Sequence, residues 1–114
     1  MELTVIEQND ELIHLALSGR LDAMGVKDIE PRFMAETTCH KKLVIVDLSG
    51  VDFITSMGIR MLVGCFRILK MENARMALLR PQPFIHNALR ATALDQVFPI
   101  LQDATQARDL LKRN

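Results

Sequence analysis

A serine at the predicted start of a helix is the residue in this chain best placed for chemistry. Ser56 follows a buried-strand pattern and a turn, and a helical pattern runs from it to about Met71. A serine at such a position commonly caps the helix, its hydroxyl accepting a hydrogen bond from a first-turn N–H group. The same N–H groups and the positive end of the helix dipole favour a bound phosphate. Ser56 is therefore a candidate helix cap and a candidate phosphorylation site.

The sequence shows no catalytic or metal-binding constellation. Its three histidines, His14, His40 and His86, have no metal-ligand spacing. No glycine-rich nucleotide loop and no nucleophile-elbow motif occurs. We predict no catalytic residue, no metal and no cofactor. We interpret His14, on the polar side of a half-buried strand, as a solvated imidazole or one at the rim of the core.

Composition narrows the class of protein. The chain has 114 residues, 49% of them hydrophobic, and its 14 basic and 14 acidic side chains give a net charge of +0. We expect no nucleic-acid partner, because such partners need a basic stripe. We expect no membrane association, because no apolar run approaches the ~20 residues of a span. Cys39 and Cys65 show no CxxC spacing and no export signal is visible, which predicts a cytoplasmic protein.

Apolar periodicity predicts an α/β fold, a mixed sheet of four or five strands with about four helices mainly on one face. Residues 3–17 form a hairpin about a turn at 8–11, with the second strand ending at Gly19. Asp22 is a possible cap of the next helix, in which Pro31 marks either a late start or a kink.

The unbroken apolar run at residues 43–46 predicts a central strand over residues 43–48, with Val44 and Val46 on one face and Leu43 and Ile45 on the other. Residues 47–52, with a glycine at 50, are predicted as a turn. Later segments are predicted as a strand at 76–79, a helix at 85–92, a weak strand at 97–101 and a helix after Asp103, with Ala107, Leu110 and Leu111 inward.

The helix after Ser56 carries two apolar stripes. The first is expected to pack on the sheet and comprises Ile59, Leu62, Val63, Phe66 and Leu69. The second lies on roughly the opposite side and comprises Met57, Met61, Gly64 and Ile68. It either packs under a neighbouring helix or is a surface for a partner.

Residues 44–66, VIVDLSGVDFITSMGIRMLVGCF, resemble the signature of STAS domains (sulphate transporter and anti-sigma factor antagonist), especially the stand-alone bacterial anti-sigma factor antagonists. SGRLD at residues 18–22, PQPFIHNALRATALDQVF at 81–98 and QDATQARDLL at 102–111 resemble other parts of the family. The resemblance implies one STAS domain over residues 1–114. Where the family usually has glycine after the third helix this chain has Ala93, which indicates a different helix ending.

The resemblance implies a partner-switching role. Ser56 matches the phosphoacceptor, with Thr55 as a rival. The implied contact residues are Asp22, Thr55, Met57, Gly58, Arg60 and Met61. The implied partners are a serine-protein kinase that acts as anti-sigma factor, which binds the unphosphorylated protein and phosphorylates it, and a PP2C-like phosphatase that reverses this. Self-association of the protein as a weak homodimer is a further candidate interaction.

Other functions remain as alternatives. The first is a STAS scaffold that is not phosphorylated, within a larger signalling or lipid-transport assembly. The second is a small-molecule sensor, which would require a pocket near the helix N-terminus. Asp22 has its own alternative, since it could be a plain helix cap.

Overall fold

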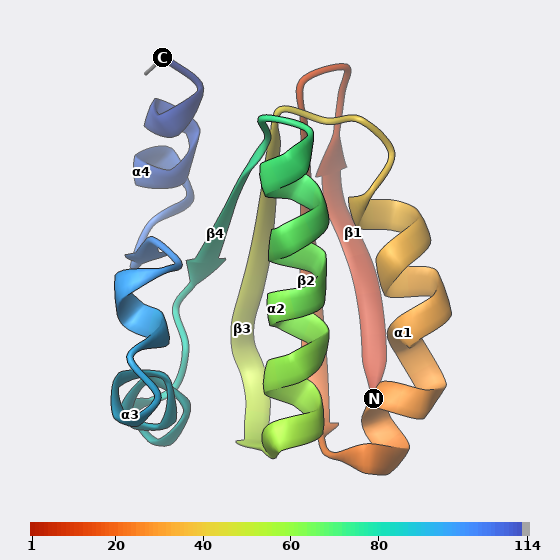
Figure 1. Cartoon of the computed structure of the whole chain (residues 1–114), viewed down its shortest axis with the longest axis vertical. Coiled ribbons are helices and arrows are strands. Elements are labelled where there is room, and N and C mark those ends of the chain that lie inside the picture. Colours follow the sequence, from red (N-terminus) through yellow and green to blue (C-terminus); the bar gives the residue numbers. More distant parts are fainter. Residues whose placement is uncertain (113–114) are drawn as a thin grey trace.

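A five-stranded sheet forms the middle of the computed structural model, which describes residues 1–112 (Figure 1). The strands lie in the order β1-β2-β3-β4-β5, with β1 antiparallel to β2 and the other neighbours parallel. Their bounds are β1 Glu2–Gln8, β2 Leu12–Leu21, β3 Leu43–Ile54, β4 Arg75–Leu79 and β5 Ile100–Leu101. The helices are α1 Ala23–Thr37, α2 Ser56–Met71, α3 Pro83–Ala91 and α4 Ala104–Arg108, with 3₁₀ helices at Leu94–Gln96 and Asp109–Lys112. The predicted mixed α/β architecture and its element order are confirmed.

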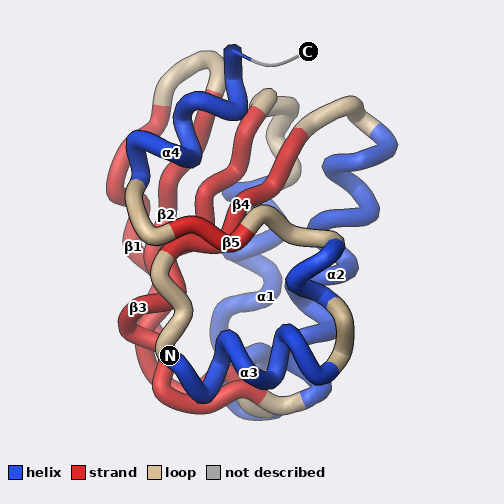
Figure 2. Tube along the Cα trace, turned by 90° about the vertical axis from the view of Figure 1, so that its left-hand side faces the viewer, coloured by secondary structure: helices blue, strands red, loops and turns tan. Residues whose placement is uncertain are grey.

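Both faces of the sheet are buried, as the apolar run in β3 predicts. Val44 and Val46 belong to the larger core, which packs beneath α1, α2 and α3. Leu43 and Ile45 belong to a smaller core that α4 covers through Ala107. Figure 2 shows α4 on the opposite side of the strands from α1 and α2. The predicted central position of β3 is confirmed. Residues 113–114 and the predicted inward side chain of Leu111 lie outside the described part of the chain.

The predicted turn at residues 47–52 is wrong, because β3 continues to Ile54. Gly50 serves a close approach between strands rather than a turn. A Cβ on Gly50 would lie 2.7 Å from the Cβ of Ser18 on β2. β2 likewise runs past Gly19 to Leu21, and its pairing with β3 shifts register on both sides of residues 18 and 19. With these irregularities, both strands extend beyond the residues that the apolar pattern indicates. They reach the end of the sheet at which α2 begins.

Helix α1 starts at Ala23, so of the two alternatives for Pro31 the late helix start is wrong. Asp22 caps the helix, with its Oδ1 accepting a hydrogen bond from the Gly25 amide at 2.9 Å. Pro31 lies inside the helix at an exposed position. The cap and the first turn therefore determine where α1 begins.

The interior face of α2 is displaced around the helix from the predicted stripe. The buried residues are Gly58, Met61, Leu62, Cys65 and Leu69, whereas Ile59, Val63 and Phe66 are half-buried. Phe66 packs edge-to-face on Phe98 at 5.3 Å between ring centroids. Met61, predicted on the second stripe, is thus part of the core.

The end of α3 keeps a left-handed residue despite the missing glycine. Ala93 has φ 59° and its amide donates to the Arg90 carbonyl oxygen at 2.9 Å. The expectation of a different helix ending is wrong in this respect, since an alanine adopts the conformation that suits glycine. The last strand is shorter than predicted and starts at Ile100, directly after Pro99, whose nitrogen carries no hydrogen to pair.

His14 is buried, which corrects its interpretation as a solvated imidazole. Its side chain is on the α4 face of β2, where it is 6% exposed and its Nε2 has no hydrogen-bond partner among the described residues. Burial lowers the pKa of His14, although Asp47 acts in the opposite direction. Asp47 itself accepts hydrogen bonds from the Ser49 amide and the Arg80 guanidinium, each at 2.8 Å. These bonds outweigh the effect of burial and leave the pKa of Asp47 below its ordinary value.

Candidate functional site

The N-terminus of α2 presents Ser56 to solvent. Ser56 is the first helical residue and is exposed, while the capping position belongs to Thr55. The prediction that Ser56 caps the helix is therefore wrong. At the first helical position, a side chain is not needed to accept a hydrogen bond from a backbone N–H group of the helix. The Ser56 hydroxyl can therefore react without removing a helix cap.

The hydroxyl of Thr55 is enclosed. Its Oγ1 is buried, makes no capping hydrogen bond and has no hydrogen-bond partner among the described residues. The Thr55 amide donates to the Leu21 carbonyl oxygen at 3.1 Å, which ties the start of α2 to the end of β2. The two neighbouring hydroxyls, Thr55 and Ser56, thus differ sharply in access to a phosphate donor.

Gly58 allows the first turn of α2 to lie directly against β2. A Cβ at this position would lie 2.6 Å from the Leu21 carbonyl oxygen and 3.0 Å from Cγ1 of Ile54. This contact places Asp22, the residue after Leu21, beside the start of α2. The pKa of Asp22 is lowered, first by the hydrogen bond from the Gly25 amide. Arg20 also pairs with Asp22 at 3.3 Å.

The predicted contact residues divide into accessible and buried ones. Met57 and Arg60 are exposed beside Ser56, and Met57 keeps 41% of its surface exposed. Gly58 and Met61 are buried, the latter at 2% exposed, so neither residue offers appreciable surface to a partner. Of the predicted contact residues on α2, the accessible ones are Met57 and Arg60, which lie close to the exposed Ser56.

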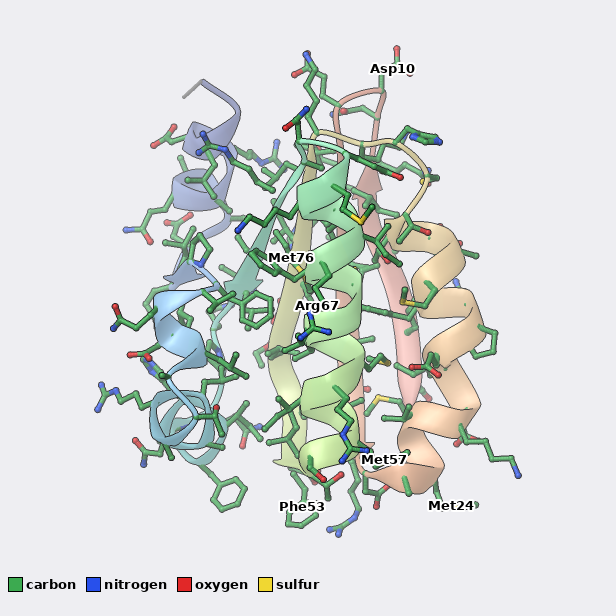
Figure 3. All side chains as sticks on the ribbon, viewed as in Figure 1. Asp10, Met24, Phe53, Met57, Arg67 and Met76 are labelled. Atoms are coloured by element: carbon green, nitrogen blue, oxygen red, sulfur yellow. The ribbon has the colours of Figure 1, made fainter. Side chains whose placement is uncertain are left out.

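An aromatic cluster beside this site is missed by sequence reasoning. The rings of Phe53 and Phe84 stack with centroids 6.1 Å apart and planes at 13°. The Arg20 guanidinium carbon lies 4.2 Å from the centre of the Phe53 ring. Phe84 is 57% exposed, which is unusual for a phenylalanine. Figure 3 shows Phe53, Met57 and Met24 together at the end of the molecule where α2 begins.

The sequence carries a partial signal for this cluster. Along α3 the inward residues are Ile85 and Leu89, so Phe84 falls beside the helical stripe rather than on it. The contact with Phe53 joins positions 31 residues apart, and Arg20 comes from a third element. Only the folded chain brings the three together. The resulting surface offers apolar area with one cation, a composition suited to protein docking.

The described residues give little support for a metal site, for a ligand pocket at the start of α2 or for a membrane-spanning helix. Within residues 1–112, no group of three or more His, Cys, Asp or Glu side chains is arranged to hold a metal ion. A surface pocket of about 340 Å³ lies between β1 and α1, lined by residues such as Leu3, Asp28 and Arg32. None of its lining residues belongs to α2, so it is not the pocket that a sensor with its site at the α2 N-terminus would require. No helix within the described range is long and apolar enough to cross a membrane.

The model of the STAS domain family matches residues 4–107. This chain belongs to the STAS domain family. Its relatives include BtrV of Bordetella bronchiseptica, a protein assigned as an anti-sigma factor antagonist. BtrV is 20% identical over 112 residues, which cover 98% of this chain and 96% of BtrV.

Solved STAS structures share the fold closely. SpoIIAA, an anti-sigma factor antagonist, superimposes in its unphosphorylated form with a TM-score of 0.81 at 20% identity, covering 97% of this chain and 96% of SpoIIAA. Bacillus SpoIIAA in its phosphorylated form gives 0.73 at 20% identity over 96% and 99%. An anti-sigma factor antagonist from Mycobacterium paratuberculosis gives 0.82 at 22% identity over 97% and 95%. At these identities the likeness is one of fold.

Proposed function

We propose that this STAS protein is an anti-sigma factor antagonist that switches partners through phosphorylation of Ser56. Unphosphorylated, it binds a serine-protein kinase that serves as anti-sigma factor in the cytoplasm. Phosphorylation of Ser56 by that kinase ends the binding, and a PP2C-like phosphatase restores it. The protein itself acts by binding and performs no catalysis. Likeness in fold to SpoIIAA, known in both unphosphorylated and phosphorylated forms, supports the proposal.

The observation that carries the proposal is the contrast between two adjacent hydroxyls. Ser56 is exposed at the first position of α2, and the Thr55 hydroxyl beside it is buried. A kinase must bring its ATP γ-phosphate in line with an accessible oxygen, so Ser56 is the better acceptor. The contrast argues against Thr55 as the rival acceptor.

The surroundings of Ser56 favour a phosphate without requiring a change of fold. The first-turn N–H groups of α2 and its dipole stabilise negative charge. Arg60 lies one turn further on the same helix and is exposed, so it can pair with a phosphate at residue 56. A charge of about −1.5 to −2 would then appear beside the apolar surface of Met57, Phe53 and Phe84. A partner that buries this surface would have to desolvate that charge, which weakens binding.

The test uses the full chain with a candidate partner kinase and ATP, monitored by intact mass and by affinity. Ser56→Ala should fold with a free energy of unfolding within about 0.5 kcal/mol of the parent, because the residue is exposed. It should take up no phosphate and keep its partner in ATP. Ser56→Asp should fold and bind more weakly, because it places one negative charge on the docking surface.

Thr55→Ala is the matched control and should still take up one phosphate. If Ser56→Ala takes up phosphate and Thr55→Ala does not, the acceptor assignment is wrong. If neither Ser56 variant alters binding to any candidate kinase, the switch is wrong, and a STAS scaffold that is not phosphorylated becomes the better description.

A further inference from the structure

Helix α2 carries an apolar seam that the sheet does not use. Met57, Met61, Gly64, Ile68 and Met71 follow one another at intervals of 4, 3, 4 and 3 residues, the spacing of a coiled-coil seam. We call these five residues the α2 seam. Met61 is buried and forms its floor, while Met57, Ile68 and Met71 are 41%, 37% and 86% exposed. The seam therefore reaches the surface at Met57 near the start of the helix and at Ile68 and Met71 near its end, on either side of the buried Met61.

Gly64 lies at the middle of the seam and has no steric reason to be glycine in the isolated protein. A Cβ built on Gly64 meets nothing within 4 Å, whereas one on Gly58 or Gly25 would strike the backbone. Glycine inside a helix costs about 1 kcal/mol relative to alanine. A glycine at the centre of an apolar seam allows another backbone to approach closely. The missing side chain thus leaves room for a partner's helix to cross α2 at this point.

The charges beside the seam identify the kind of partner. Arg60 and Arg67, seven residues apart, immediately precede Met61 and Ile68 and occupy the flanking positions that form ion pairs in coiled coils. Both are exposed, and no Asp or Glu occurs between Ser56 and Met71. On the other flank Gly58 and Cys65 are buried in the protein, and the third position is Glu72 at the end of α2, whose carboxylate lies 3.6 Å from His40. Along the length of the helix the charges that a partner meets beside the seam are therefore those of Arg60 and Arg67.

A second copy of this chain is a poor occupant. Because the flank with Gly58 and Cys65 is buried, two α2 helices could meet only through their arginine flanks. Arg60 and Arg67 would then face the same residues of the other copy, and such like-charge pairs are unfavourable.

We propose that the α2 seam docks an amphipathic helix of another protein, whose own apolar seam is flanked by Asp or Glu. This interaction goes beyond the switch at Ser56, although it shares Met57 and Arg60 with the surface beside that residue. The acidic flank pairs with Arg60 and Arg67, the apolar residues cover Met57, Ile68 and Met71, and the crossing point is Gly64.

The test uses two synthetic helices, stapled so that both are helical before binding. Both carry leucine at 4-3-4-3 spacing, one with glutamate and the other with lysine at every flanking position. The full chain is titrated with each, and binding is followed by fluorescence anisotropy at low salt. The glutamate helix should bind about three- to tenfold more tightly, because Arg60 and Arg67 attract its glutamates and repel the lysines of the other helix.

Three variants locate the site. Gly64→Gln, which fills the crossing point, should weaken the glutamate helix at least about tenfold while the protein stays folded by circular dichroism. Arg60→Glu combined with Arg67→Glu should reverse the preference to the lysine helix. Val97→Gln changes an apolar residue outside α2 whose exposed fraction, 40%, is close to the 41% of Met57. This variant should leave binding unchanged.

Equal affinity for the two helices, or unchanged binding by Gly64→Gln, would overturn the proposal. So would sedimentation showing a dimer of the protein alone that Gly64→Gln dissociates, because the occupant would then be a second copy. Phosphate incorporation at Ser56 is measured separately by intact mass, so either proposal can fail while the other stands.

Discussion

The α-carbon of Gly58 lies so close to Leu21 that a methyl group on it would come within 2.6 Å of the Leu21 carbonyl oxygen and 2.7 Å of its Cγ. The same carbonyl accepts the Thr55 amide at 3.1 Å. The end of β2 and the first turn of α2 are therefore fixed relative to each other. Ser56 is held on this junction, so its position depends on two elements distant in sequence.

Replacing glycine by alanine at two positions of α2 should have opposite effects. Gly58→Ala should lower the free energy of unfolding by about 1 to 3 kcal/mol, because the new methyl group overlaps the Leu21 backbone. Gly64→Ala should raise it by about 1 kcal/mol, because the position is helical and open. Urea denaturation of both variants measures the difference. Equal effects of the two substitutions would show that the close contact at Leu21 does not exist.

Thr55→Val should leave stability unchanged or increase it by up to about 1 kcal/mol, because the Thr55 hydroxyl is buried without a hydrogen bond among the described residues. Thr55→Ser, which keeps the hydroxyl and removes a methyl group, is the matched control and should be less stable than the parent. Thermal unfolding compares the three proteins. A clear loss of stability in Thr55→Val would mean that the hydroxyl has a partner after all.

Ala93→Gly should raise the free energy of unfolding by about 1 kcal/mol. Ala93 has φ 59°, a conformation that costs an alanine about 1 to 2 kcal/mol and that glycine adopts freely. The gain is smaller than the relieved strain because glycine also increases the freedom of the unfolded chain. Ala91→Gly, two residues earlier and inside α3, provides the control and should destabilise. The denaturant midpoints of Ala93→Gly and Ala91→Gly, each compared with that of the parent, test this prediction.

Stability should fall as the pH drops below 6.5, with His14 as a principal cause. Burial lowers the pKa of His14 in the folded protein, so the unfolded chain binds the proton first. The free energy of unfolding then declines from pH 6.5 downward until the folded-state pKa is passed, with a slope of up to about 1.4 kcal/mol per pH unit. The lowered pKa of Asp47 adds its own loss below pH 3.8, in a separate window.

The check is urea denaturation of the parent and of His14→Gln at several pH values between 4 and 7, about the interval in which an exposed histidine titrates. The variant should have a flatter dependence on pH, whatever its absolute stability. His86→Gln controls for the loss of one histidine. An unchanged slope in His14→Gln would assign the acid sensitivity to another group.

The sequence predicts the architecture well wherever one pattern has one structural meaning. The uninterrupted apolar run at residues 43–46 requires a strand buried on both faces, and β3 is such a strand. Asp22 before a helical pattern predicts a cap, and it is one. Gly50 has two meanings, turn or close approach, and the chain alone cannot choose between them.

The site is predicted less completely, for reasons visible in particular residues. Thr55 and Ser56 are both capping types, so a one-residue shift in the helix start exchanges their roles. Helix α2 is apolar on most of its circumference, and the burial of Met61 rather than Val63 depends on where α1 and the sheet lie. The stacking of Arg20, Phe53 and Phe84 joins three separate elements, so no local sequence pattern predicts it.

The cover that α4 places over the second face of the sheet has a consequence for how the protein is made. Leu12, Leu43, Ile45, Ala77 and Leu79 are all buried on that face, and α4 closes over them, with Arg108 paired to Glu7 on β1. On the ribosome, every one of these strand residues is synthesised before α4 exists. During that interval the nascent sheet exposes an aliphatic face, the kind of surface that promotes aggregation and that chaperones shield. Emergence of α4 would then cover that face and remove it from solvent.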